Sequence, residues 1–380
     1  MKRLLFVILC VILCLNITSC NRKDEVIIGL NYEGSGVLSP YGKALLYGTE
    51  LAVEEINASG GIDGHRLKLE RADNRSQGVE SASAVLYLKS VKDADVIIGP
   101  ATSTLAKAAL SAGADVLIIS PSATADSLLR SNTSFDLQGQ HRFSQSENIV
   151  SSNARTSFIR LCFSDSVQGS AMGEYANSRG FEKAAVIVDM SSDYSVGCAA
   201  AFRSSFLGEV VFEGRFLSGE SDFSALVTEL SKTEFDCVYL PAYYTEAGLF
   251  IRQSREQGID KTFLGGDAMD SPYLADVIGK SEYLHDVIYT DHFSYDDENF
   301  KIFAQKYRDR YGETPPAYSA LAYDSVMLYC QKLRERGLEN IQTVEKEIFN
   351  TESFSGVTGK ITIKENGDCE KQPVFVSLSD

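Results

Sequence analysis

Residues 95–124 constrain the fold of this chain more than any other stretch. They contain two short apolar runs, Val96–Ile98 and Val116–Ile119, separated by an alanine-rich segment that begins near Ser103 and has the composition of a helix. Apolar runs that are rich in β-branched residues and lack polar alternation are typical of parallel strands covered on both faces. The stretch therefore predicts a strand–helix–strand unit of an α/β fold.

Small hydroxyl residues follow both predicted strands. Thr102 and Ser103 follow the first, and Ser122 and Thr124 follow the second. Parallel sheets bind ligands at the carboxyl ends of their strands, and the start of a helix offers N–H groups and a positive dipole end to a carboxylate. These four residues are therefore candidate ligand contacts. The alternative is that they only cap the helix and turns, a common role of Ser and Thr.

The first 20 residues have the features of an export signal. Lys2 and Arg3 precede an apolar run, residues 4–15, that is too short to span a bilayer as a stable anchor. Small residues then lead to Cys20, which resembles the cleavage site of a bacterial lipoprotein signal. The alternative is an ordinary signal peptide with an incidental cysteine. We expect a protein of the cell envelope, anchored to a membrane by lipid on Cys20 and facing the periplasm or the exterior.

The length and charge of the remaining chain narrow its class. About 360 residues are enough for two lobes with separate cores. Without Lys2 and Arg3 the 36 basic residues become 34 against 52 acidic ones, so the formal net charge changes from −16 to −18. A balance this negative argues against nucleic-acid binding.

Strands and helices are predicted to alternate along the chain in two blocks. The first block has, besides the unit described above, predicted strands at 26–30 and 67–72 and predicted helices at 41–57 and 76–91. The second block is predicted to begin with a strand at Phe158–Cys162. We infer an α/β fold with two doubly wound, Rossmann-like lobes, and a polar insertion without evident structure at 125–155.

The sequence contains no recognisable catalytic motif. It has no G-x-S-x-G elbow, no Walker A pattern and no H-E-x-x-H, and no third glycine follows Gly34 and Gly36 at dinucleotide-binding spacing. We therefore expect no enzyme, no metal and no cofactor; a hydrolase that uses Ser103 is the enzymatic alternative, and it lacks a paired base. The four histidines share no motif and are expected to be surface or satisfied residues: His65, His141, His285 and His292.

Five cysteines follow Cys20, and none of them forms a C-x-x-C pair. Their odd number and strand-like surroundings favour buried free thiols, although an exported protein could oxidise a pair. They are Cys162, Cys198, Cys237, Cys330 and Cys369.

Polar residues also follow predicted strands of the second block. Tyr194, Tyr243 and Asp267 each stand shortly after such a strand, where they would face a cleft between the lobes. Each has an ordinary alternative, because tyrosines beside strands usually pack and Asp267 could cap the next helix.

The order and spacing of several motifs resemble the leucine/isoleucine/valine-binding protein family, the type I periplasmic binding proteins that feed ABC importers. The resemblance covers essentially the whole mature chain apart from the insertion. The motifs are INASGGIDG at 56–64, IGP at 98–100 with Ser103, ISPSAT at 119–124, SDSVQG at 164–169, DFSAL at 222–226, the run 236–244 and Tyr323-Asp324.

The resemblance implies a set of ligand contacts. The serine that holds the ligand carboxylate falls on Ser103, and further backbone and hydroxyl contacts fall on Ser122 and Thr124. The carboxylate that pairs with the ligand ammonium falls on Asp267, where the best-known members have glutamate. The aromatic contacts fall on Tyr41, Tyr194, Tyr243 and Tyr318.

The resemblance also implies the arrangement of the lobes. Residues 21–158 with 291–365 are expected to form lobe 1, and residues 159–290 with 366–380 lobe 2, joined by a three-strand hinge. In the first-lobe pocket Ala101 and Thr102 replace the bulky residue of the family. The preferred ligand side chain is therefore open.

Together these features predict a monomeric binding protein of an ABC importer. An amino acid, branched-chain or similar, would lie between the lobes, with lobe 1 donors on its carboxylate and Asp267 on its ammonium group. Because the two ends contact different lobes, binding would favour the closed hinge. The alternative is a sensor of amides or other small molecules that does not serve transport.

Overall fold

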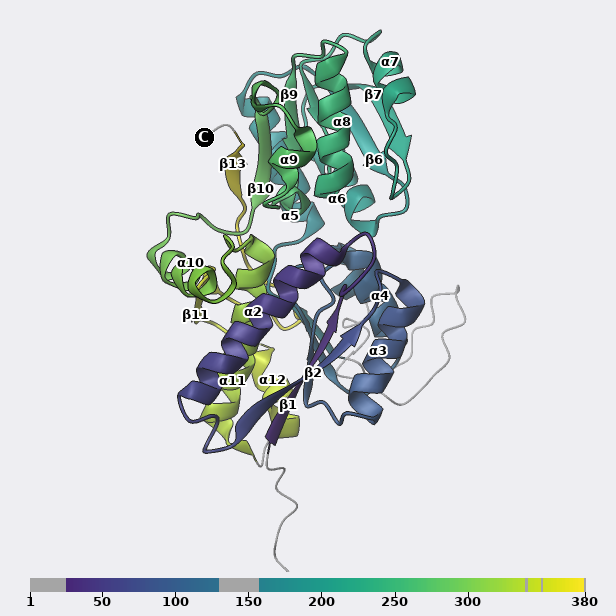
Figure 1. The fold of residues 1–380 in the computed structure, drawn as a ribbon. Helices are drawn as coiled ribbons and strands as arrows, with labels where there is room; N and C mark the ends of the chain where they lie inside the picture. The colour runs from purple at the N-terminus through teal and green to yellow at the C-terminus, as the bar shows by residue number, and fades with distance from the viewer. Residues whose placement is uncertain (1–24, 130–156, 339–340, 350, 379–380) are drawn as a thin grey trace, which may run out of the picture.

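The computed structural model describes residues 25–129, 157–338, 341–349 and 351–378, which form two α/β lobes stacked end to end (Figure 1). The predicted signal segment with Cys20, and residues 130–156 of the predicted insertion, lie outside the described residues.

The first lobe contains a parallel sheet with the strand order β2-β1-β3-β4-β5. In β3, Val96 and Ile98 belong to a core on one face of the sheet and Ile97 to a core on the other. Burial on both faces explains why these strands are continuous apolar runs. The elements of this sheet and its flanks are β1 (Glu25–Tyr32), α2 (Ser39–Ala58), β2 (Arg66–Asp73), α3 (Gly78–Ser90), β3 (Val96–Ile98), α4 (Ser103–Ser111), β4 (Leu117–Ser120) and β5 (Ser157–Arg160).

Helices from the end of the chain complete this lobe. Helix α11 packs along α2 over one face of the sheet, whereas α3 and α4 pack together on the other. These C-terminal elements are α10 (Glu298–Tyr311), α11 (Ala317–Arg336), α12 (Ile341–Ile348) and the hairpin of β11 (Phe354–Gly356) and β12 (Gly359–Ile361).

The second lobe contains a sheet with the order β13-β10-β9-β8-β6-β7, in which only β13 runs antiparallel to its neighbour. Helices α5 and α6 cover one face, and α7 and α8 cover the other. The elements are α5 (Asp165–Ser178), β6 (Lys183–Asp189), α6 (Asp193–Ser205), β7 (Glu209–Phe216), α7 (Ser224–Leu230), β8 (Cys237–Tyr239), α8 (Tyr244–Glu256), β9 (Thr262–Gly265), α9 (Leu274–Ile278), β10 (Val287–Asp291) and β13 (Val374–Ser377).

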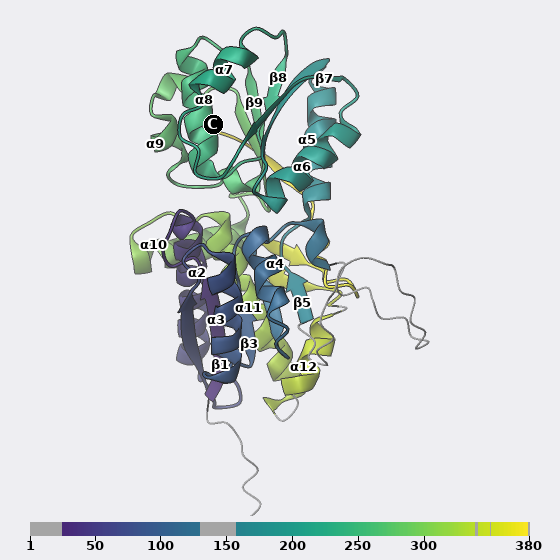
Figure 2. The ribbon, with the colours of Figure 1, turned by 90° about the vertical axis from the view of Figure 1, so that its right-hand side faces the viewer.

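Three segments of chain connect the two lobes (Figure 2). They follow β5, follow β10 and precede β13. Arg160, at the end of β5, is 1% exposed and ties the first of these segments to the third. Its Nε donates to Asp368 Oδ1 at 2.8 Å, and its Nη1 donates to the carbonyls of Thr124 and Ala125 at 2.5 and 3.2 Å.

The strand predicted to open the second block belongs to the first sheet. Strand β5 pairs in parallel with β4, with Phe158 opposite Ile118 and Arg160 opposite Ser120. The predicted change of lobe between residues 158 and 159 therefore falls inside a strand. A buried apolar run has the same pattern in either sheet, so only the hydrogen-bond ladder identifies its partner.

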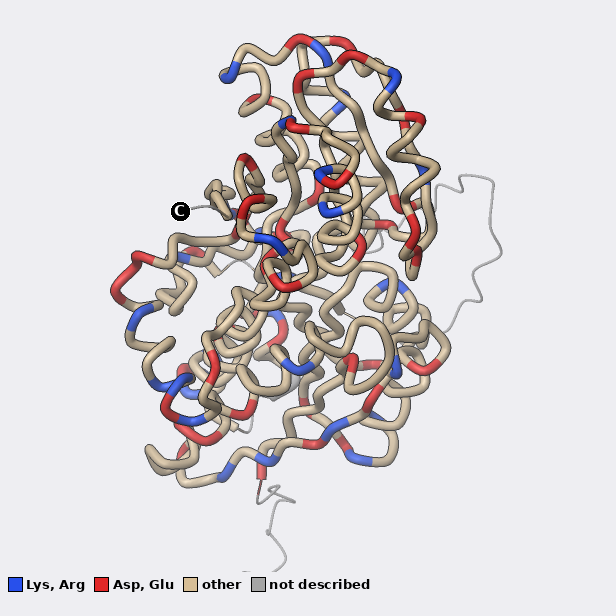
Figure 3. The backbone as a smooth tube through the Cα atoms, turned by 45° about the horizontal axis from the view of Figure 1, so that its top comes forward, with Lys and Arg blue, Asp and Glu red and all other residues tan. Residues whose placement is uncertain are grey.

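Other sequence expectations concern thiols, membrane spans and surface charge. The five cysteines after Cys20 are buried and free, as predicted. Among the described residues, none of the helices combines the length and apolar character needed to cross a membrane. Acidic and basic residues are interspersed over both lobes (Figure 3).

Candidate functional site

The first-lobe candidates lie on two buried loops that hydroxyl groups connect. Ser122 Oγ donates to the Ala101 carbonyl at 2.9 Å, and the Ala125 N–H donates to Ser103 Oγ at 3.0 Å. Thr102 is the N-cap residue of α4, and its side chain makes no capping hydrogen bond. The hydroxyls thus join the loops after β3 and β4 rather than cap the helix. Because Ser103 Oγ acts as an acceptor here, its proton remains to be donated.

Thr124 connects this part of the site to the second lobe. Its carbonyl accepts the Asp165 N–H at 2.9 Å, and its hydroxyl bonds the Asp165 side chain, whose pKa burial raises well above the usual range. Gln168 on α5 donates Nε2 to Asp165 Oδ1 at 3.5 Å and accepts the Asp267 N–H at 3.1 Å. A polar chain therefore runs from the first-lobe loops to Asp267.

Asp267 follows β9 and is 1% exposed. Its Oδ2 accepts from His292 Nε2 at 3.0 Å, whereas its Oδ1 is buried without a hydrogen-bond partner among the described residues. Burial lowers the pKa of His292, so the ring is neutral at pH 7; since Nδ1 is also unpartnered, we assign the proton to Nε2. A buried carboxylate oxygen without a donor is costly, and an ammonium group would satisfy it.

Gly266 allows neighbouring side chains to pack closely against the loop that carries Asp267. A Cβ on Gly266 would lie 2.1 Å from Tyr194 Oη and 2.8 Å from Gln168 Oε1. Tyr194 Oη then accepts the Ala268 N–H at 3.4 Å. The small residue before Asp267 is thus what permits this close packing.

Four tyrosines from both lobes meet beside Asp267. The ring centroids of Tyr41 and Tyr243 are 5.5 Å apart, those of Tyr41 and Tyr318 4.8 Å, and those of Tyr194 and Tyr243 5.8 Å. Burial raises the pKa of Tyr194, Tyr243 and Tyr318, and the negative charge of Asp267 raises each further. The Asp267 carboxylate therefore lies close to this tyrosine cluster.

Tyr41 bonds the two lobes together in a closed arrangement. From α2 of the first lobe, its Oη donates to the Ala268 carbonyl at 2.6 Å and accepts the Tyr244 N–H at 3.0 Å. Lys107 and Asp193 form a further contact between the lobes, with 3.2 Å between Nζ and Oδ1. The lobes thus meet directly at the predicted site.

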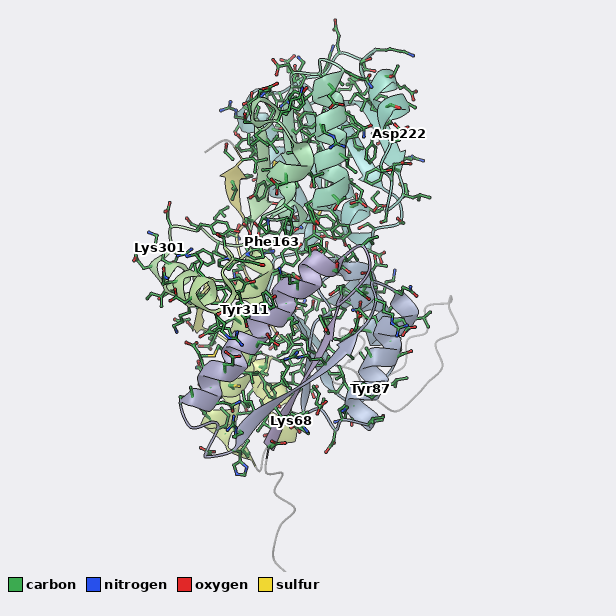
Figure 4. The ribbon with its side chains drawn as sticks, in the orientation of Figure 1. Lys68, Tyr87, Phe163, Asp222, Lys301 and Tyr311 are labelled. Carbon is green, nitrogen blue, oxygen red and sulfur yellow. The ribbon has the colours of Figure 1, made fainter. Side chains whose placement is uncertain are left out.

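Two of the connecting segments contact each other beside Asp267. Phe163, on the first of them, lies where the lobes meet (Figure 4), and its ring stacks on His292 with 4.0 Å between centroids. A pocket lined by residues of both lobes opens beside the tyrosine cluster. Its lining includes Tyr41, Lys43, Asp270, Tyr273 and Tyr318.

The structure brings the ten predicted residues into one region, and it adds others that the sequence interpretation missed. Ala101, Thr102, Ser103, Ser122 and Thr124 form its first-lobe side, and the tyrosine cluster and Asp267 complete it. His292 was expected to be a surface or satisfied residue; this was wrong, because it is buried beside Asp267 and its Nδ1 has no partner among the residues that the structure describes.

Glu33, the second missed residue, follows β1 and contacts Ala101 and Thr102. The position of Glu33 and His292 directly after buried strands was the signal that could have identified them. Strand β1 neighbours β3, and β10 neighbours β9, so their carboxyl ends meet at the site.

Comparison with known proteins identifies relatives of similar length. Residues 25–377 match the family described as periplasmic binding protein. The Leu/Ile/Val-binding protein homolog 1 of Brucella abortus is 28% identical over 364 residues, which cover 93% of this chain and 89% of that protein.

Two solved structures share the fold over nearly the whole chain. LivJ, the substrate-binding protein of a branched-chain amino acid transporter from Streptococcus pneumoniae, was solved with isoleucine; it is 32% identical, with a TM-score of 0.82 over 93% of this chain and 96% of that one. The leucine-binding protein LivK from Thermotoga maritima is 29% identical, with a TM-score of 0.79 and the same coverage. The chain therefore belongs to the type I periplasmic binding proteins of the leucine/isoleucine/valine-binding family, which are substrate-binding proteins of transporters and not enzymes.

Proposed function

We propose that this protein binds a free α-amino acid between its two lobes and delivers it to an ABC permease. The observation that carries the proposal is Asp267 Oδ1, a buried carboxylate oxygen close to the tyrosine cluster that lacks a donor in the described part of the chain. Ser103 and the N-terminus of α4 supply donors for the carboxylate at the opposite end of the ligand. The names of the relatives suggest a branched-chain or similar side chain.

Contacts to both the carboxylate and the ammonium group of the amino acid would account for its affinity and for closure of the two lobes. Charge-assisted hydrogen bonds contribute about 1.5–3 kcal/mol each in a site that excludes water. Three or four of them correspond to a Kd on the order of micromolar after ordering costs. Since Ser103 and Asp267 belong to different lobes, a bound amino acid stabilises the closed state, which is the form that we propose the permease recognises.

Calorimetric titration with the L-amino acids, their amides and their deaminated analogues tests this proposal. We expect at least one amino acid to bind in the micromolar range. Its amide, which lacks the carboxylate, and its deaminated analogue, which lacks the ammonium group, should each bind at least about 100-fold more weakly, because each leaves one end unpaired. Amides that bind where amino acids do not would instead support a sensor of amides.

The N-terminal cysteine is proposed to anchor the protein. Exchanging Cys20→Ser should move the protein from the membrane fraction to the soluble fraction, since the lipid-bearing residue is lost. Fractionation followed by immunoblotting measures this, with Cys330→Ser as the matched control because that thiol is buried in the core. Unchanged membrane association of the Cys20→Ser protein would rule out the anchor.

A further inference from the structure

Glu33 is a second buried carboxylate in the site, and it is not explained by recognition of the α-amino and α-carboxyl groups. Its side chain is 0% exposed. The Ala101 N–H donates to Oε1 at 3.1 Å and to Oε2 at 3.3 Å, and the N–H and hydroxyl of Thr102 reach Oε1 at 3.4 and 3.5 Å. These donors are neutral, and three of the four distances exceed 3.2 Å, so the carboxylate retains capacity for a stronger partner.

The backbone at Glu33 is held firmly in place. Register pairs Leu30 of β1 with Ile98 of β3, so Glu33 and Ala101 follow the two strands side by side. A Cβ on Gly42 of α2 would lie 2.1 Å from the Glu33 carbonyl oxygen, which shows how closely the helix covers this residue. The carboxylate is therefore positioned by the fold rather than by a mobile loop.

Two carboxylates from opposite lobes act electrostatically on the same tyrosine. The charges of Glu33 and Asp267 both contribute to the raised pKa of Tyr243. Among the described residues, the contacts of the Glu33 carboxylate include no lysine, arginine or histidine. Burial raises the pKa of Glu33 to about 7. A carboxyl group with this pKa is partly protonated at neutral pH, and a cationic group of a ligand beside it would favour its ionised form.

We propose that Glu33 determines the side-chain specificity of the site and receives a positively charged ligand side chain, so that the preferred ligand is a basic amino acid rather than the branched-chain one that the names of the relatives suggest. This rests on the proposed function, in which Asp267 takes the α-ammonium group. Ala101 and Thr102, which donate to Glu33, have small side chains. The tyrosine rings beside it suit a cation as well, through the negative charge of their faces.

Lysine and norleucine, which differ by the terminal ammonium group of lysine, measure this preference directly. In calorimetry the wild-type protein should bind lysine at least about tenfold more tightly than norleucine, a difference of about 1.4 kcal/mol. Glu33→Gln keeps the shape of the side chain and removes its charge. This variant should bind lysine at least about tenfold more weakly than wild type and should bind norleucine equally tightly or more tightly. Glu33→Asp, which keeps the charge on a shorter side chain, should still favour lysine. Glu352→Gln, at an exposed position, should behave as wild type.

The outcomes separate this inference from the proposed function. If norleucine or leucine binds as well as lysine, and Glu33→Gln does not change their ratio, Glu33 does not set specificity, while amino-acid binding stands. If no amino acid binds, the proposed function fails and the inference fails with it. If Glu33→Gln does not fold, the wild-type preference between lysine and norleucine still decides the question.

Discussion

Replacing Asp267 with asparagine is expected to weaken amino-acid binding at least about 100-fold, or roughly 3 kcal/mol. Asparagine keeps the shape and still accepts the His292 Nε2–H, but it lacks the negative charge that pairs with an ammonium group. In the free protein Asp267 Oδ1 has no donor among the described residues. The substitution therefore removes an interaction that exists only when the amino acid is bound. Titration calorimetry with the tightest-binding amino acid measures the effect.

A matched control distinguishes this contact from a general change of charge. Asp276→Asn removes an exposed carboxylate on α9 of the same lobe. The affinity of this variant for the amino acid should stay within about twofold of wild type. Both variants should melt near the wild-type temperature. Unchanged affinity in the Asp267→Asn protein would remove this residue from the site and with it the proposed recognition of the ammonium group.

Arg160→Met should reduce the free energy of unfolding by about 3–5 kcal/mol. The substitution removes a buried charge that donates to Asp368 and to the carbonyls of Thr124 and Ala125. These acceptors would stay in place without their donor, and the first and third connecting segments would lose the side-chain bond between them. Urea unfolding followed by circular dichroism gives the change in midpoint at constant slope.

The control for this prediction is an arginine of the same chain on the surface. Arg308 on α10 is exposed, and Arg308→Met should change stability by about 0.5 kcal/mol or less. Arg160→Lys keeps the charge without the planar group that reaches three acceptors, and should fall between wild type and Arg160→Met. A loss below about 1 kcal/mol for Arg160→Met would contradict the role assigned to this residue in the hinge.

Much of the fold followed from local pattern. Val96–Ile98 and Val116–Ile119 are apolar because both faces of their sheet are covered, so their composition alone indicated strands of an α/β lobe. The sheet to which a strand belongs was not encoded in this way. Strand β5 was assigned to the wrong block, because its buried residues would suit either sheet and only pairing with β4 places it.

In the candidate site, too, some residues followed from local pattern and others only from the pairing of strands. Thr102, Ser103, Ser122 and Thr124 could be named as candidates because hydroxyls after parallel strands lie at the edge where such sheets bind ligands. Glu33 was not, because its relevance depends on contacts with Ala101 and Thr102, 68 and 69 positions along the chain. The role of a lone charged residue depends on what surrounds it once the strands are paired.

By itself, the sequence determined two α/β lobes, the strand ends that form the candidate site and the polar residues that stand there, because these depend on periodicity and on neighbours along the chain. Tertiary structure alone decided which charges face each other. Among the described residues it left one oxygen of Asp267 without a donor, buried His292 beside this carboxylate and placed Glu33 against Ala101 and Thr102. Those facts arise from the pairing of distant strands and from the meeting of two lobes, neither of which is written in any local stretch of residues.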